Sequence, residues 1–297
     1  MIVRPPFSLG SAVFGAPGGL VLVGSLFYKA DRKVLDHKKG KVNMPALTRE
    51  LKAVKILRER IGLNHAIDVI AETPQAMENY LRILAEITDD PLLIGGLNEE
   101  TRVAGFRKAR EMKIQDRCGV NSIASATSEE ELKSIRKSGI KFAILQTLDP
   151  SAVYPEEKVG LLKGGLLGKC DKASIDRVVV DVGIIDFTSA WLAAESIKRI
   201  KAELGIPAGC APSNAAYQPL VKKKITRSSA RSMNVALNTI IQLAGADFII
   251  YGPLRASTYV FEAAAVVEGI KAYGKRLGGE KVMDRNHPLY KLLPRLM

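Results

Sequence analysis

The stretch DDPLLIGGLNEETRVAGFRKAREM, residues 89–112, contains the junction that decides the fold. Its apolar run from Pro91 to Ile94 stops at Gly95 and Gly96, and an amphipathic helical pattern begins near Asn98. A short buried strand followed at once by a helix is the repeating unit of parallel α/β folds. Barrels of this kind place their functional side chains at such junctions. A strand that ends in glycine therefore requires an explanation.

Similar apolar runs recur along the chain about every 25–40 residues, with helical periodicity between them. The eight runs are LVLVGSLF (20–27), HAIDVIAE (65–72), PLLIGG (91–96), DRCGVNSIA (116–124), KFAILQTL (141–148), DRVVVDVGII (176–185), IPAGCAP (206–212) and DFIIYGPL (247–254). Apolar runs without alternation are typical of parallel strands that are buried on both faces. The pattern predicts an α/β fold, a (β/α)8 TIM barrel formed by residues 1–297 as one domain. A doubly wound open sheet is the alternative.

The segments between the runs carry helix signals of different clarity. The motif TSEEE (127–131) resembles a capping box before a helix. We expect a helical pair over residues 44–62, after the first strand. A long loop leading to a short helix is expected over residues 150–172, which are rich in Gly and Lys. The tail NHPLYKLLPRLM (286–297) is expected to form a surface arm that serves a subunit contact.

The chain of 297 residues carries a formal net charge of +13. Much of the excess is spread along helical patterns, and only DRKVLDHKKGK (31–41) and KKKITRSSAR (222–231) are dense. A solvated basic face is the favoured interpretation, an acidic protein partner or an anionic ligand the second, and nucleic acid the least favoured. We therefore expect no nucleic-acid partner.

Several classes of protein are disfavoured by what the sequence contains. No apolar run reaches the roughly 18 residues that a membrane span needs, and the first residues lack the apolar core of a signal peptide. The cysteines, Cys118, Cys170 and Cys210, are widely separated, which fits a reducing compartment and gives no Cys-x-x-Cys spacing. We expect a cytoplasmic protein with no direct membrane insertion and no bound metal.

The predicted strand ends carry carboxylates and amides rather than histidine or lysine. A Schiff-base aldolase would need a buried lysine there, and a zinc hydrolase two or three histidines. His37, His65 and His287 all lie elsewhere, and KGGLLGK (163–169) lacks the spacing of a phosphate-binding loop. Carboxylates accept from amino and ring N–H groups, whereas amides both donate and accept. This chemistry suits a flat, uncharged heterocycle.

Five motifs, in order, resemble those of the H subunit of tetrahydromethanopterin S-methyltransferase: LVGSLFY (22–28), DVIAETPQAM (68–77), DDPLLIGG (89–96), VNSI (120–123) and DFIIYGPL (247–254). The resemblance extends over roughly residues 20–265. That family is part of a pterin-binding barrel superfamily, with dihydropteroate synthases and methyltetrahydrofolate:corrinoid methyltransferases. It implies methyl transfer between N5 of a reduced pterin and the cobalt of a corrinoid protein.

The resemblance also implies roles for individual residues. Asn121, which would hydrogen-bond near N5, and Asp68 are the candidate catalytic residues. Asp181 matches an aspartate that holds the amino-pyrimidine edge of the pterin. The substrate-binding candidates are Asp181, Asn214, Gly95 and Ser25. The expected mechanism is direct displacement, in which Asn121 stabilises a proton on the departing N5 amine and Asp68 orders the local hydrogen bonds.

Gly95 departs from the family pattern, because relatives read LIDS where this chain reads LIGG. A missing charge-assisted hydrogen bond to a pterin N–H would cost roughly 1.5–3 kcal/mol. Three outcomes follow as alternatives. The pocket retains pterin methyl transfer, which we favour, or it uses a changed methyl donor or acceptor. Otherwise the chain is a non-catalytic scaffold that binds a corrinoid protein without a standard pterin.

The expected partners follow from the same resemblance. The methyl carrier would be tetrahydromethanopterin or tetrahydrofolate, and the corrinoid would belong to a partner protein. A multisubunit methyltransferase complex and a homodimer are also expected. Any tie to a membrane would be peripheral and would pass through partner subunits.

Overall fold

Eight parallel strands close into a barrel in the computed structural model, which describes residues 2–15, 19–282 and 284–292. The strand order around the barrel is β10-β11-β12-β3-β6-β7-β8-β9, which confirms the predicted (β/α)8 fold. The barrel strands are β3 (Val21–Leu26), β6 (Asn64–Ala71), β7 (Leu92–Gly96), β8 (Cys118–Ile123), β9 (Phe142–Gln146), β10 (Arg177–Asp181), β11 (Ala208–Cys210) and β12 (Phe248–Pro253). Each lies within one of the eight predicted runs, except that β6 begins one residue before its run.

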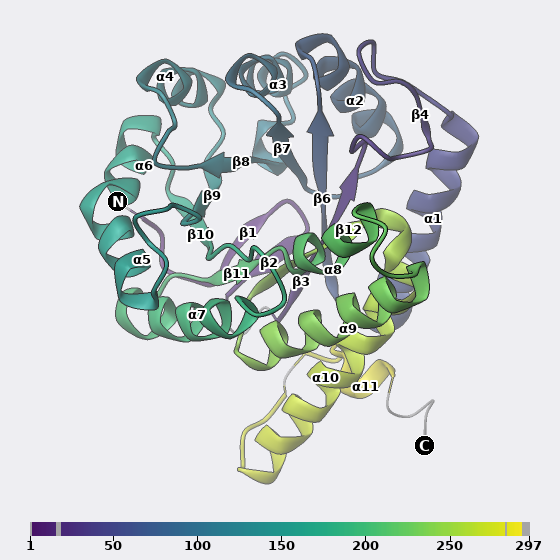
Figure 1. Ribbon diagram of the computed structural model, residues 1–297, viewed down its shortest axis with the longest axis vertical. Coiled ribbons are helices and arrows are strands. Elements are labelled where there is room, and N and C mark those ends of the chain that lie inside the picture. Colours follow the sequence, from purple (N-terminus) through teal and green to yellow (C-terminus); the bar gives the residue numbers. More distant parts are fainter. Residues whose placement is uncertain (1, 16–18, 283, 293–297) are drawn as a thin grey trace.

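Helices surround the strands, and α10 extends away from the barrel with α11 beside it (Figure 1). The α-helices are α1 (Met44–Ile61), α2 (Pro74–Ile87), α3 (Glu99–Glu111), α4 (Glu129–Ser138), α5 (Pro155–Leu161), α6 (Leu167–Ala173), α7 (Ala190–Leu204), α8 (Pro212–Val221), α9 (Arg227–Leu243), α10 (Ser257–Leu277) and α11 (Pro288–Lys291). Three shorter turns are η1 (Gln115–Arg117), η2 (Leu162–Leu166, a π-helix) and η3 (Leu254–Ala256). The strands run from the base of the barrel to a mouth at their carboxyl ends.

Two short hairpins were not predicted. The hairpin of β1 (Phe7–Leu9) and β2 (Ala12–Phe14) packs its apolar side chains into the barrel interior, where Phe14 and Phe142 have ring centroids 4.9 Å apart. Gly10 of its turn lies against Arg117 and Pro91, which precede β8 and β7, so the hairpin closes the base of the barrel. The second hairpin, β4 (Val34–Asp36) with β5 (Lys41–Val42), follows the first barrel strand.

Two predicted connections were wrong. Residues 44–61 form one helix rather than a pair, because apolar positions recur along its whole length and Gly62, at φ +81°, ends it. Residues 155–173 form continuous helix through α5, η2 and α6 rather than a long loop. The glycines within this segment lie in helical turns with open space around them, so they do not interrupt it. The helix begins with Pro155 at its first position, where proline is favoured.

The described part of the tail does not form a free arm. Leu289 of α11 is buried, and Lys291 Nζ donates to the Glu59 carbonyl of α1 at 2.7 Å. His287 caps α11 by accepting from the Leu289 N–H at 3.1 Å. The last residues of the predicted arm, 293–297, lie outside the described residues.

Candidate active site

The carboxyl ends of the strands bring polar residues to one layer of the barrel. Ala66 of β6 belongs to the interior cluster, so Asp68, two residues further along, also faces the interior. In the strand registers, Ser25 of β3 lies opposite Asp68, and Gly95 of β7 lies opposite Asn121 of β8. These four predicted site residues therefore come from four adjacent strands at the mouth.

Asp68 is the centre of a short hydrogen-bonded chain. The Ser25 hydroxyl donates to Asp68 Oδ2 at 3.0 Å, and the Asn121 side-chain amide donates to Asp68 Oδ1 at 3.0 Å. Because a carboxylate only accepts, the NH2 group of Asn121 is turned toward Asp68. The carbonyl oxygen of Asn121 is then left to accept from a donor above the mouth. Burial raises the pKa of Asp68, and its two hydrogen bonds oppose that rise.

Asp181 supplies a second carboxylate to the same layer. It is buried, and its Oδ1 accepts from the Gly183 N–H at 2.8 Å. Burial raises its pKa to about 6, against the opposing effects of the Gly183 hydrogen bond and the Lys158 ammonium. The Asp68 charge raises it further, so the two carboxylates influence each other. Asp181 is therefore ionised at neutral pH but takes up a proton in mildly acidic solution.

Gly95 explains how this chain accommodates the two hydrogen bonds of Asp68. A Cβ atom at position 95 would lie 3.1 Å from Asp68 Oδ1 and 3.5 Å from the backbone carbonyl oxygen of Asn121. An aspartate here would place a second carboxylate directly against Asp68. The like charges would repel, and one of the two would have to take up a proton. The glycine at the strand end thus gives Asp68 and Asn121 the space in which they meet.

Asn214 is the predicted residue that does not join this group. Strand β11 ends at Cys210, so Asn214 falls in the first turn of α8, where it is exposed. Its buried neighbour Ser213 instead donates to the Ile250 carbonyl of β12 at 3.1 Å. The role of Asn214 in substrate binding stays a prediction.

A polar cavity of about 240 Å³ opens beside Asn121. Its walls come from the ends of β7, β8 and β9 and from the connection between β8 and α4. The lining residues are Gly96, Arg102, Asn121, Ser122, Ala124, Ala126, Thr127 and Gln146. Lys169 holds the wall in place, because its Nζ donates to the carbonyls of Ala124, Ser125 and Thr127 at 3.1, 2.6 and 2.7 Å. The cavity next to Asn121 is therefore bounded by a fixed loop.

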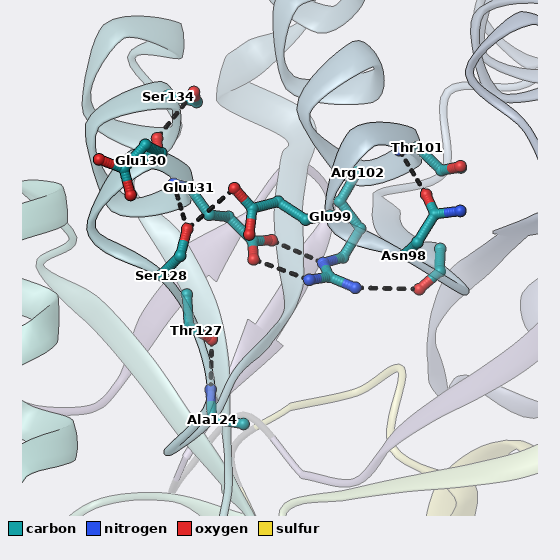
Figure 2. A network of polar contacts seen from close by, with 11 residues as sticks. Asn98, Glu99, Thr101, Arg102, Ala124, Thr127, Ser128, Glu130, Glu131 and Ser134 are labelled. Atoms are coloured by element: carbon teal, nitrogen blue, oxygen red, sulfur yellow. Dashed lines mark hydrogen bonds and ion pairs between the residues drawn. The ribbon is translucent and has the colours of Figure 1, made fainter.

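An ion pair fixes another wall of the cavity (Figure 2). Arg102 donates to both carboxylate oxygens of the buried Glu131, at 2.6 and 2.7 Å, and its Nη1 reaches the Gly96 carbonyl at 3.2 Å. Ser128 caps α4 by accepting from the Glu131 N–H at 3.0 Å. The predicted capping box is thus only half formed, because the Glu131 carboxylate pairs with Arg102 and not with the backbone of α4.

Lys158 is a site residue that sequence reasoning missed. It is buried on α5, and its Nζ donates to the Thr147 and Ala152 carbonyls at 3.1 and 2.9 Å. Burial lowers its pKa, whereas the Asp181 charge raises it. Lys158 thus orders the loop after β9 and stabilises the ionised form of Asp181. Pro155 at the start of a helix, followed by acidic residues, was the signal that would have placed Lys158 on a helix.

His65 contributes to structure away from the mouth. His65 lies near the start of β6 at the base, where its Nε2 is 3.2 Å from the Tyr251 hydroxyl and its Nδ1 3.5 Å from Asp90 Oδ2. Within the described ranges, no group of three or more His, Cys, Asp or Glu side chains is arranged to hold a metal ion. Among the same residues, no helix has the length and apolar character needed to cross a membrane.

The chain matches known proteins along nearly its whole length. A family model described as the tetrahydromethanopterin S-methyltransferase MtrH subunit matches residues 9–282. The H subunit of tetrahydromethanopterin S-methyltransferase from Methanothermobacter marburgensis is 29% identical over 298 residues, which cover 96% of each chain. The corresponding H subunit from Methanosarcina barkeri is 27% identical over 305 residues, again 96% of each chain.

Solved structures with the same fold are dihydropteroate synthases. The Xanthomonas albilineans enzyme with 4-aminobenzoic acid has a TM-score of 0.61 at 13% identity, covering 89% of this chain and 97% of that chain. The Yersinia pestis enzyme with a sulfonamide drug complex has a TM-score of 0.60 at 13% identity, covering 86% and 94%. At these identities the likeness shows the barrel fold alone.

Proposed function

Because this chain belongs to the family of the tetrahydromethanopterin S-methyltransferase MtrH subunit, a family of methyltransferases, we propose that it moves a methyl group between N5 of a methyl-tetrahydropterin and the cobalt of a corrinoid protein. The carrier would be tetrahydromethanopterin or tetrahydrofolate. The single observation that carries the proposal is the chain of hydrogen bonds from Ser25 through Asp68 to Asn121, with Asp181 in the same layer.

The donor and acceptor groups of this layer fit a reduced pterin. Asp181, ionised at neutral pH, has an oxygen left to accept from the amino and ring N–H groups of the pyrimidine edge. With its amide donating to Asp68, Asn121 would use its carbonyl to accept from a protonated N5. The resulting arrangement holds the ring by its edge and supports its proton at the reacting nitrogen. Positioning of this kind is worth several kcal/mol when the geometry is right.

Methyl transfer from an N5-methyl amine is slow because the amine leaves poorly without a proton. The corrinoid, when its protein is bound, supplies the cobalt that accepts the methyl group. Asn121 stabilises the proton on N5 as the carbon–nitrogen bond breaks, so that the nitrogen leaves neutral. Asp68 holds the amide of Asn121 and thereby keeps the carbonyl turned toward N5. Ser25 holds Asp68 from the other side.

An apolar rim is the surface we propose for the corrinoid protein. The loops after β9 and β10 contact each other, because Gly183 lies against Leu148. Trp191 and Tyr154, exposed by 67% and 55%, line a hollow of about 580 Å³ between α7 and α5. The exposed apolar side chains of this rim are Leu148, Val153, Tyr154, Ile185, Phe187 and Trp191. Large exposed apolar patches beside a site are typical of protein interfaces.

The apolar rim can be tested without changing Asp68, Asn121 or Asp181, the residues that we call the ring site. Phe187→Ser with Trp191→Ser should raise the KM for the corrinoid protein about tenfold, because both side chains would be desolvated in the complex. The affinity for the pterin should not change. Ile56→Ser, at an exposed apolar position on α1, is the matched control and should leave both values as they are. An unaltered KM in the double variant would place the partner elsewhere.

We propose that residues 1–297 act as one barrel domain and that the protein works as a peripheral subunit of a multisubunit methyltransferase complex. A homodimer is supported by exposed apolar side chains on helix α10, which projects from the barrel (Figure 1). They are Val266, Ile270, Tyr273 and Leu277, at helical spacing. Apolar residues repeated three and four apart form a single helix face.

The proposed function is tested by titrating the protein with methyl-tetrahydromethanopterin and with methyl-tetrahydrofolate. A cobalt(I) corrinoid protein is then added, and methylation of the cobalt is followed by its absorbance. Saturable binding of at least one carrier and enzyme-dependent methylation are expected. Gly95 favours a second candidate, a scaffold or altered-substrate protein, because it stands where the family pattern has aspartate. Capture of the corrinoid protein without binding of either pterin would select that candidate.

A further inference from the structure

A group of exposed cations lies on the side of the mouth formed by β11, β12 and β3. It occupies the connection between α8 and α9, the first turns of α9, and η3. Its members, which we call the cationic rim, are Lys222, Lys223, Lys224, Arg227, Arg231 and Arg255. Among residues 2–15, 19–282 and 284–292, no carboxylate lies within 4.0 Å of these cations, whereas most of the arginines on α3 and α7 have acidic partners. The rim therefore carries positive charge that no carboxylate of the described residues neutralises by a direct ion pair.

Tyrosines hold two of these guanidinium groups in place. Arg255 lies 5.7 Å from the centre of the Tyr28 ring and donates to the Tyr28 hydroxyl. Arg231 lies 5.9 Å from the centre of the Tyr259 ring, whose hydroxyl is 2.5 Å from that of Tyr217. Aromatic faces orient a guanidinium while leaving its charge in place. The two arginines are thus ordered but still free to bind an anion.

The carboxylates nearest to Arg255 are already paired. Asp31 and Glu50 both influence Arg255 through their charge. Lys33 forms ion pairs with both, at 2.9 and 2.5 Å. Lys33 thereby balances one of these two negative charges, and the other partly offsets the charge of Arg255.

The cationic rim adjoins the ring site directly. Ser25, which donates to Asp68, lies opposite Pro253 in the β3–β12 register, and Arg255 follows two residues later. A Cβ atom at Gly252 would lie 3.2 Å from the Tyr217 ring, so α8 packs onto the end of β12. A ligand seated on Asp68 and extending over Ser25 would reach the tyrosines and arginines of the rim.

We propose that the cationic rim binds the anionic tail of the methyl-carrying pterin, through its phosphate or carboxylate groups. The proposal rests on the proposed function, because the ring must first lie at Asp68, Asn121 and Asp181. Arginine forks bind carboxylate and phosphate oxygens in pairs, and the flexible lysines add attraction at longer range. The ring site then selects a pterin, and the rim selects carriers whose tails are charged.

The test compares carriers that share a ring but differ in charge. The probes are 5-methyl-tetrahydrofolate with one and with six glutamates, and a tail-less 5-methyl-tetrahydropterin, titrated calorimetrically at about 20 and about 300 mM salt. We expect the six-glutamate carrier to bind more tightly at low salt and to lose most of that advantage at high salt, since exposed charges are screened. The tail-less carrier should bind equally at both salt concentrations.

Charge-removing variants locate the effect. Lys222→Gln with Lys224→Gln should weaken binding of the six-glutamate carrier about fivefold at low salt, and Arg255→Gln about tenfold. Neither should alter binding of the tail-less carrier. Lys52→Gln with Lys55→Gln, on the exposed face of α1, removes the same charge and should have no effect. Arg255→Lys keeps the charge and should restore part of the loss, which separates binding from folding.

Three results would overturn the inference alone while pterin binding persists. One is equal affinity for tailed and tail-less carriers. Another is an equal loss of affinity for the six-glutamate carrier in the α1 control, which would mean that only the overall positive charge of the protein attracts the tail. The third is a raised KM for the corrinoid protein with unchanged pterin affinity, which would make the rim a surface for an acidic partner. Binding of none of the carriers by the unmodified protein would instead overturn the proposed function, and the inference with it.

Discussion

On the side of the mouth formed by β6, β7 and β8, the carboxylates are hydrogen-bonded to neighbouring side chains, whereas the cations beside β11, β12 and β3 have no acidic partner among the described residues. Asp68 is held by Ser25 and Asn121, and Glu131 by Nε and Nη2 of Arg102. Arg231 and Arg255 instead rest on tyrosine rings. Groups that satisfy each other fix a geometry, while ordered charges without partners attract a ligand. The two sides therefore suit a reacting ring and its charged extension.

Removal of the Asn121 side chain should have the largest effect of the changes on the β6, β7 and β8 side of the mouth. In Asn121→Ala, the N5 proton loses its acceptor and Asp68 loses one donor, so methyl transfer should slow about 1,000-fold. The dissociation constant of the pterin should rise far less. Single-turnover rates and calorimetric binding give the two values. Asn79→Ala, which removes an amide from α2, is the control, and equal rates in the two variants would exclude Asn121 from the mechanism.

Asp181→Asn should weaken pterin binding and raise the free energy of unfolding. Loss of the charge should weaken pterin binding about 10- to 100-fold at pH 7. The raised pKa, about 6, means that the folded state holds a proton more tightly than the unfolded chain. The free energy of unfolding therefore falls as pH rises from about 4 to about 6, and the penalty is complete above that range.

The uncharged Asp181→Asn variant avoids this penalty. It should be about 1–3 kcal/mol more stable than the wild type at pH 7. Below about pH 4, where Asp181 becomes protonated in both states, the difference should vanish. Urea unfolding at neutral and at acidic pH measures it. A gain of equal size in acid would show that packing, and not the buried charge, is responsible.

Gly95→Asp should place a second negative charge beside Asp68. Crowding of the new carboxylate against Asp68 should raise the pKa of one of the pair. Methyl transfer at pH 6 should fall about tenfold and recover partly toward pH 8, as both groups ionise. Gly95→Asn, which has the same size without charge, should show no such pH dependence. Activity above wild type in Gly95→Asp would mean that the missing aspartate, and not the space, limits this chain.

Asn214→Ala should have the smallest effect on pterin affinity. It tests whether the ring site extends as far as β11. Its exposed position in the first turn of α8 leads us to expect a change of less than about twofold in pterin affinity. A tailed and a tail-less carrier, titrated in parallel, measure it. A tenfold loss with both carriers would place Asn214 at the ring and extend the ring site across β11.

The barrel and the layer around Asp68 were predictable because both depend on local pattern. Parallel strands carry apolar runs, and their carboxyl ends meet at one edge, so Asp68 and Asn121 had to converge. Arg102 and Glu131 were not predictable as a pair, since their partnership depends on how α3 packs beside α4. Lys158 was missed because a glycine-rich helix resembles a loop in sequence.

The hairpin at the base escaped detection for a different reason. Strands β1 and β2 have three residues each, too few for alternation to be visible. Their contribution comes from long-range packing, in which Phe7 and Phe14 meet Phe142 of β9. Short strands are stabilised by what they pack against and not by their own pattern.

This base gives the molecule a single entrance. With Phe7, Leu9 and Phe14 filling the bottom of the barrel, a small molecule and a docking protein must use the same opening. A carrier lying on the floor would be covered by whatever protein comes to collect its methyl group. The carrier then enters before the protein and departs after it. Product-inhibition kinetics should accordingly follow an ordered sequence, in which the demethylated carrier dissociates only after the docked protein has left.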